Sequence, residues 1–139
     1  VAGDVVVDEH VLGKLDKNQK VLSPGMKYRH YAPQAKCILV YSKDNLKMVN
    51  KINEILQEYK NPVVISCSEN IERYNTKNKI DIGSKKHLEE ISKNLFTDLR
   101  KVDKYNPDIV IIEGVDKSGI GLAIMNRLIR ACEYNYIEV

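Results

Sequence analysis

Apolar and polar residues follow two different patterns from residue 36 to residue 139. Short continuous apolar runs, such as Cys37–Tyr41, are typical of strands buried on both faces of a sheet. Longer stretches carry apolar residues at steps of three and four, as Val49, Ile52 and Leu56 do, and indicate amphipathic helices. The two kinds of stretch alternate along the chain. The pattern therefore predicts alternating strands and helices.

Alternating elements of this length define a fold class. Asn61-Pro62 and Asn106-Pro107 mark two helix ends, because proline cannot continue a helix. Strands joined through helices form right-handed crossovers and a parallel sheet. We predict an α/β fold, a three-layer Rossmann-like domain with a mostly parallel sheet of about five strands, whose order the pattern leaves open. The expected strands are Cys37–Tyr41, Pro62–Cys67, Lys79–Ile82, Asp108–Glu113 and Tyr136–Val139, and the expected helices lie within 44–59, 84–102 and 122–129.

Residues 1–35 show neither of these two patterns. They contain Pro24, Gly25 and Pro33, which interrupt regular structure. We expect an irregular N-terminal arm over 1–35 and a single α/β domain over 36–139.

The composition narrows the class of protein. Hydrophobic residues make up 43% and charged residues 29%, and no apolar run is long enough to cross a bilayer, so we expect a cytoplasmic protein without membrane contact. The three cysteines, Cys37, Cys67 and Cys132, are far apart and form no C-x-x-C pair. We therefore expect reduced thiols and no metal site.

Positive charge is concentrated in one segment. Six Lys and Arg residues and no Asp or Glu occur from Lys17 to Lys43, which favours a local anionic ligand over a whole-surface interaction with nucleic acid. Within it, five consecutive residues carry cationic, aromatic or hydrogen-bonding groups between two stiff ends. The candidate substrate-binding residues are Lys27, Tyr28, Arg29, His30 and Tyr31, with Pro24, Gly25 and Pro33 as hinge residues.

This segment has the composition of a lid. Lys27 and Arg29 can neutralise phosphate oxygens, and His30 can donate to a phosphate. The two tyrosines can stack on an adenine ring or hydrogen-bond a ribose or carboxylate. A lid that closes over a bound nucleotide excludes water and completes an electrostatic site. The alternative is a basic linker that lies on an acidic patch.

Ligands of open parallel sheets bind beyond the carboxyl ends of the strands, so we look at the loops after Tyr41, Cys67, Ile82 and Glu113. The loop from Glu113 to Gly121 is the best candidate, because Gly119 and Gly121 next to a helix start can expose backbone N–H groups to an anion. It matches no nucleotide-binding fingerprint, and a tight turn with close packing is the alternative. We expect no catalytic residue within the chain.

Two stretches carry a resemblance to a known family. Ser23-Pro-Gly-Met-Lys-Tyr-Arg-His-Tyr-Ala-Pro33 resembles the interdomain linker motif of the long, two-domain form of threonylcarbamoyl-AMP synthase. Ser118-Gly-Ile-Gly-Leu-Ala-Ile-Met-Asn-Arg-Leu-Ile-Arg-Ala131 is similar to the C-terminal signature of that family. Nothing in the chain resembles the family's catalytic domain, so we expect the tail of that domain and the linker in 1–35, and a fragment inactive alone.

The resemblance implies a function for the whole enzyme. An N-terminal YrdC-type domain would use ATP, L-threonine and bicarbonate, with magnesium, to form threonylcarbamoyl-AMP and pyrophosphate. A downstream transferase would then modify tRNA. Residues 27–31 would face the substrates as a lid over that domain, and the α/β domain would position them. A stand-alone nucleotide- or phosphate-binding module and a tRNA- or protein-interaction module remain the alternatives, and direct tRNA binding stays open.

Overall fold

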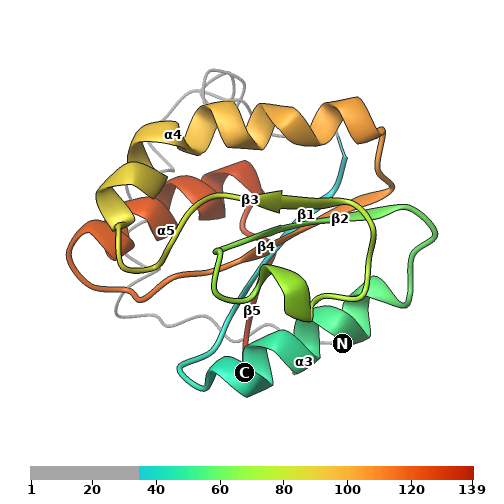
Figure 1. Ribbon diagram of the computed structural model, residues 1–139, viewed down its shortest axis with the longest axis horizontal. Helices are drawn as coiled ribbons and strands as arrows, with labels where there is room; N and C mark the ends of the chain where they lie inside the picture. Colours follow the sequence, from blue (N-terminus) through green and yellow to red (C-terminus); the bar gives the residue numbers. More distant parts are fainter. Residues whose placement is uncertain (1–34) are drawn as a thin grey trace.

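Five parallel strands form one sheet in the order β3-β2-β4-β1-β5, with helices on both faces (Figure 1). The computed structural model describes residues 35–139. The strands are β1 (Cys37–Tyr41), β2 (Pro62–Ser66), β3 (Lys79–Asp81), β4 (Ile109–Glu113) and β5 (Tyr136–Glu138). The helices are α3 (Asn45–Leu56), α4 (Leu88–Arg100) and α5 (Ile120–Ala131), with 3-10 turns η2 (Ile71–Arg73) and η3 (Lys101–Tyr105). The predicted α/β fold with a parallel sheet of five strands is confirmed, and the predicted arm, except for its last residue, Ala35, lies outside the described residues.

The helices form the two outer layers. Helix α3 covers one face of the sheet, whereas α4 and α5 lie side by side on the other (Figure 1). Strands β2 and β4 at the centre are buried at every position, as a continuous apolar run predicts. Their register places Val64 beside Ile111, and Leu39 of β1 lies beside Ile112 on the other side of β4.

Helix boundaries differ from the predicted ones by at most four residues. Helix α3 begins after Asp44, whose carboxylate accepts the backbone N–H groups of Leu46 and Lys47. Helix α4 begins at Leu88 rather than at Ser84, because Ser84 belongs to a preceding turn in which its carbonyl accepts the His87 N–H. None of the helices described is long and apolar enough to cross a membrane.

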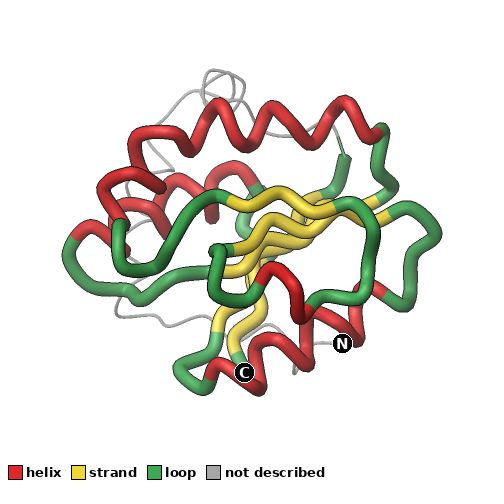
Figure 2. The backbone as a smooth tube through the Cα atoms, viewed as in Figure 1, coloured by secondary structure: helices red, strands yellow, loops and turns green. Residues whose placement is uncertain are grey.

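The strand order places two diverging connections next to each other at the carboxyl end of the sheet. Strands β1 and β4 are neighbours, yet the chain leaves β1 toward α3 on one face and leaves β4 toward α5 on the other (Figures 1 and 2). The two connections therefore diverge at the carboxyl end of the sheet. Such a point of divergence is where open α/β sheets bind their ligands.

Candidate functional site

A cavity of about 160 Å³ lies at this point of divergence. Three of the loops singled out from the sequence, those after β1, β3 and β4, contribute to its wall. Its wall includes Tyr41, Lys43, Asn45, Lys85, Leu88, Val115 and Asp116.

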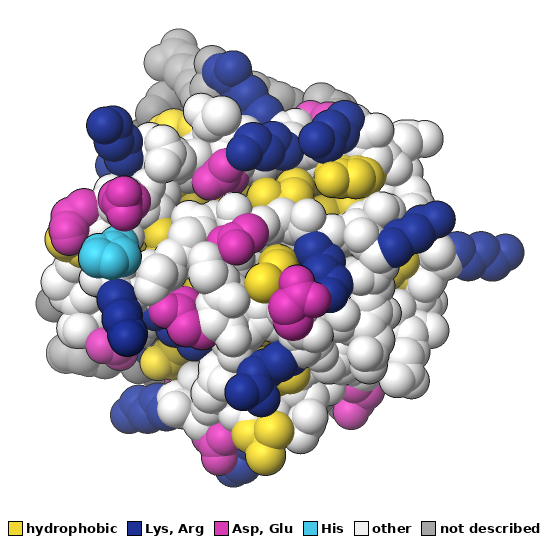
Figure 3. All heavy atoms as spheres, viewed as in Figure 1, with side chains coloured by type: hydrophobic (Ala, Val, Ile, Leu, Met, Phe, Trp, Pro, Cys, Tyr) yellow, Lys and Arg dark blue, Asp and Glu magenta, His cyan; other side chains and the backbone are white. Residues whose placement is uncertain are grey.

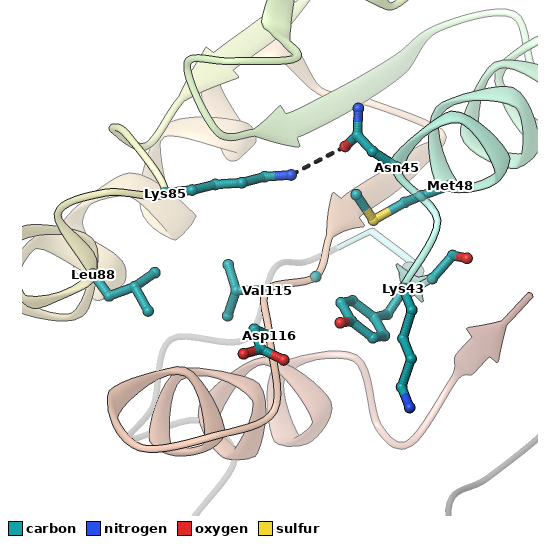
Figure 4. Close-up of a pocket in the computed structure, with 10 residues that line it drawn as sticks. Lys43, Asn45, Met48, Lys85, Leu88, Val115 and Asp116 are labelled. Carbon is teal, nitrogen blue, oxygen red and sulfur yellow. Dashed lines mark hydrogen bonds between the residues drawn. The ribbon is translucent and has the colours of Figure 1, made fainter.

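The cavity has opposite charges on opposite sides (Figure 4). Lys85 extends along one side, and its ammonium donates a hydrogen bond of 3.1 Å to Asn45 Oδ1. Asp116 lies on the other side, where the Ser118 hydroxyl donates to its Oδ2 at 2.9 Å. The apolar side chain of Val115 lies between the two charges, and Leu88 lies beside it (Figure 4). Lys43, an exposed lysine, also lines the cavity, and its side chain extends away from Lys85 (Figure 4). The wall therefore offers two cations, an anion and an apolar surface.

A buried carboxylate fixes the position of Lys85. Glu113, the last residue of β4, is fully buried. Its Oε1 accepts hydrogen bonds from Ser66 Oγ at 2.9 Å, Asn70 Nδ2 at 3.1 Å and Tyr74 OH at 2.5 Å. Its Oε2 has no hydrogen-bond partner among residues 35–139 and faces the Lys85 ammonium at 3.6 Å. Burying a carboxylate is costly, and these four groups together offset that cost.

The same carboxylate keeps two neighbouring groups protonated. Burial, reinforced by the charge of Glu113, raises the pKa of the Cys67 thiol well above its ordinary value. Burial and Glu113 likewise raise the pKa of the Tyr74 phenol. Tyr74 therefore remains a hydrogen-bond donor throughout the physiological range, and Cys67 is not an activated nucleophile.

Tyr41 forms the wall of the cavity near Asp116. Burial, with Asp116 as the next contribution, raises the pKa of the Tyr41 phenol. The Lys117 ammonium lies 5.5 Å from the centre of the Tyr41 ring and forms an ion pair of 2.8 Å with Glu138. These contacts hold the ring in place.

The predicted anion loop is built as a close-packed turn. A Cβ atom on Gly121 would lie 1.9 Å from the Asp116 carbonyl oxygen, and Gly119 has a φ of +55°. The Gly121 N–H donates to the Ser118 carbonyl, and the Leu122 N–H donates to the Gly119 carbonyl. The Gly121 and Leu122 N–H groups thus have partners within the turn, and the geometry gives Gly121 a packing role and Gly119 a conformational one. Anion binding by Gly119 and Gly121 stays a prediction.

The lid prediction lies outside the described residues. This applies to Lys27, Tyr28, Arg29, His30 and Tyr31 and to the hinge residues Pro24, Gly25 and Pro33. Sequence reasoning missed Lys85, Asn70 and Tyr74. They belong to no motif, and the only available signal was their place in the loops after β2 and β3.

Surface charge bears on the alternative of an RNA-binding module. On the face shown in Figure 3, Lys and Arg side chains of the described residues are interspersed with Asp and Glu. A nucleic-acid interface would instead gather basic side chains on one face. The described part of this face therefore does not favour direct tRNA binding.

The fold and the cavity define a Rossmann-like α/β domain with a small crevice at the carboxyl end of its sheet. The family model of the threonylcarbamoyl-AMP synthase C-terminal domain matches residues 4–132. The chain belongs to this family.

Individual relatives agree with this assignment. The threonylcarbamoyl-AMP synthase of Pyrococcus abyssi is 38% identical over 144 residues, which cover 100% of this chain and 39% of the relative. A crystal structure of P. abyssi Sua5 complexed with L-threonine has a TM-score of 0.69 and 40% identity, and the match covers 84% of this chain and 34% of that one. The C-terminal Sua5 domain of a hypothetical Pyrococcus horikoshii protein has a TM-score of 0.60 and 39% identity, covering 78% of this chain and 100% of that one.

The chain thus corresponds to the C-terminal domain of longer proteins. It spans less than two thirds of the length of its P. abyssi relative, whereas the P. horikoshii structure is matched over its whole length.

Proposed function

We propose that this chain is the linker and C-terminal accessory domain of an L-threonylcarbamoyladenylate synthase, and that its linker closes over a YrdC-type catalytic domain. The observation that carries the proposal is the family match over residues 4–132, because it includes both the Lys27–Tyr31 segment and the α/β domain in one unit. The enzyme would be a transferase that acts in tRNA threonylcarbamoyladenosine modification.

The chemistry of the linker supports this role. ATP supplies three phosphates, and Lys27 and Arg29 provide cations that can neutralise them, the arginine through two parallel hydrogen bonds. His30 and the two tyrosines add donors and aromatic faces for adenine, ribose or the threonine carboxylate. The P. abyssi relative has been solved with L-threonine, which supports L-threonine as one substrate.

The remaining reactants follow from the reaction class. Threonine and bicarbonate would form a carbamate with loss of water, and attack of the carbamate on the α-phosphate of ATP would release pyrophosphate. Magnesium would accompany ATP, and the adenylate would pass to a downstream tRNA threonylcarbamoyl transferase. The α/β domain serves as the scaffold that positions the lid, since its first strand, β1, begins a few residues after Pro33.

Adding this chain to a separately prepared YrdC-type catalytic domain tests the proposal. Pyrophosphate release from ATP, L-threonine and bicarbonate should rise above the rate of the catalytic domain alone, because the lid excludes water and completes the electrostatic site. In the full-length enzyme, Arg29→Ala and His30→Ala should each lower kcat/KM by at least about tenfold, the equivalent of one lost charge-assisted hydrogen bond.

Lys47→Ala is the matched control, because Lys47 is an exposed lysine of α3 outside the linker. Its activity should equal that of the wild type. Equal rates with and without the chain, together with full activity of both linker variants, would exclude a lid.

A further inference from the structure

We propose that the cavity at the carboxyl end of the sheet binds a small aliphatic zwitterion with the size and charge pattern of a short α-amino acid. Lys85 holds the carboxylate of the ligand, and Asp116 holds its ammonium group. Leu88 and Val115 contact the aliphatic part. This site lies within the described domain and does not depend on the proposed lid function.

The volume of the cavity limits the ligand. About 160 Å³ corresponds to the space of about five water molecules in the liquid. Pockets for drug-sized ligands measure about 300–1,000 Å³. A nucleotide would therefore extend outside the cavity, whereas a molecule the size of an amino acid fits within it.

The charges select a dipolar ligand. A ligand with net negative charge would meet Lys85 and the exposed Lys43, but also Asp116 and the buried Glu113 behind Lys85. A ligand with net positive charge would meet the ammonium groups of Lys85 and Lys43. A zwitterion pairs one charge with each side of the cavity, so each of its ends finds an opposite charge (Figure 4).

Lys85 is in position before a ligand arrives. Glu113 Oε2 and Asn45 Oδ1 hold its ammonium, and Asn45 is itself tied to Asn70 by two hydrogen bonds of 3.0 and 2.7 Å. Asp116 is oriented by the Ser118 hydroxyl. Binding then requires little ordering of side chains, and less of the interaction energy is lost to entropy.

Titration of the ¹⁵N-labelled chain with L-valine tests the site by NMR. The backbone amide signals of Leu88 and Val115 should shift in a saturable manner. N-acetyl-L-valine lacks the ammonium group and L-valinamide lacks the carboxylate, so each should bind at least about tenfold more weakly. Inorganic phosphate should leave both signals unchanged.

Variants identify the two charged groups. Asp116→Asn and Lys85→Met should each weaken L-valine binding by about tenfold or more. Lys86→Met, at an exposed position that does not line the cavity, should bind as the wild type does. Lys85→Met can unfold the domain, because it leaves the buried Glu113 without a cation. In that case the binding of L-valine to Asp116→Asn and of the two analogues to the wild type still tests the site.

Three outcomes would overturn the inference. The first is the absence of L-valine shifts at Leu88 and Val115 at the highest soluble concentration. The second is equal binding of L-valine and its two blocked analogues. The third is binding of phosphate in place of L-valine, which would assign the cavity to anions.

Discussion

Glu113 shows how one buried side chain organises a site. An unpaired buried carboxylate costs several kcal/mol, so a fully buried Glu113 requires partners from several elements. Its carboxylate accepts hydrogen bonds from Asn70 and Tyr74, which lie in the connection after β2, and forms an ion pair with Lys85, which lies in the connection after β3. The carboxylate thereby couples the core of the sheet to the loops that surround the cavity.

Burial of Tyr74, reinforced by the charge of Glu113, makes the stability of the domain fall at alkaline pH. The pKa of Tyr74 is raised above its ordinary value of 10.0, so the folded state keeps a proton that the unfolded state loses. The associated stability is fully present below pH 10 and declines as the pH rises further. Cys67, whose ordinary value is 9.0, adds to the decline from a lower pH.

We predict that Tyr74→Phe reduces this alkaline loss. At neutral pH the variant should lose about 1–3 kcal/mol, because Glu113 Oε1 loses a donor. Above pH 10 its free energy of unfolding should fall less steeply than that of the wild type, by up to about 1.4 kcal/mol per pH unit. Urea denaturation between neutral and alkaline pH measures both effects.

Ser66→Ala provides the control for that experiment. Ser66 also donates to Glu113 Oε1 but does not titrate in this range, so its loss should lower stability without changing the pH slope. Parallel pH profiles for wild type and Tyr74→Phe would contradict the role given to the phenol.

At the scale of elements, local pattern determines most of what is observed. The strands Cys37–Tyr41 and Pro62–Ser66 are buried at every or nearly every position. A continuous apolar run is the direct sequence signal of such a strand. The start of α4 was misplaced because Ser84, a typical helix-capping residue, uses its hydroxyl in a contact with Glu69 from another loop. A contact between residues far apart in sequence leaves no local pattern.

The turn before α5 allows a direct comparison of two glycines. Gly121→Ala should lower the free energy of unfolding by about 3 kcal/mol or more, because the new Cβ would lie 1.9 Å from a backbone oxygen that cannot move aside freely. Gly119→Ala meets no atom within 4 Å and should lose about 1–3 kcal/mol through its positive φ alone. Thermal or urea unfolding of the two variants measures the difference. A Gly121→Ala variant as stable as the wild type would show that the turn is looser than described.

For the whole molecule, the sequence predicts the layers but not the order of the strands. Each crossover can move to either side of the strand it leaves, and the apolar runs of β1, β2 and β4 are too alike to choose between the arrangements. The cavity depends on that order, because it requires β1 and β4 to be neighbours. The four candidate loops could therefore be named from the sequence, whereas the pairing of Lys85 with Asp116 across one cavity could not.

The cysteines offer a test of how this single core unfolds. Cys37, Cys67 and Cys132 are at most 3% exposed, and they lie at the start of β1, after β2 and after α5. Cys132 donates a hydrogen bond of 3.1 Å to the Cys37 sulfur, across 95 residues of sequence. Because thiolate is the reactive form and burial raises the pKa of both Cys67 and Cys132, alkylation requires exposure.

We predict that the three thiols react together. With a thiol reagent in increasing urea, mass spectrometry should show unmodified and triply modified chains and few intermediates, because all three thiols belong to one cooperative core. Lys47→Cys, at an exposed position of α3, should add one group at once without urea and so verify the reagent. Modification of Cys67 alone at low urea would instead show that the β2–β3 side opens separately. Lys85 and Asn70 lie on that side, so the wall of the cavity would then open without unfolding of the rest of the sheet.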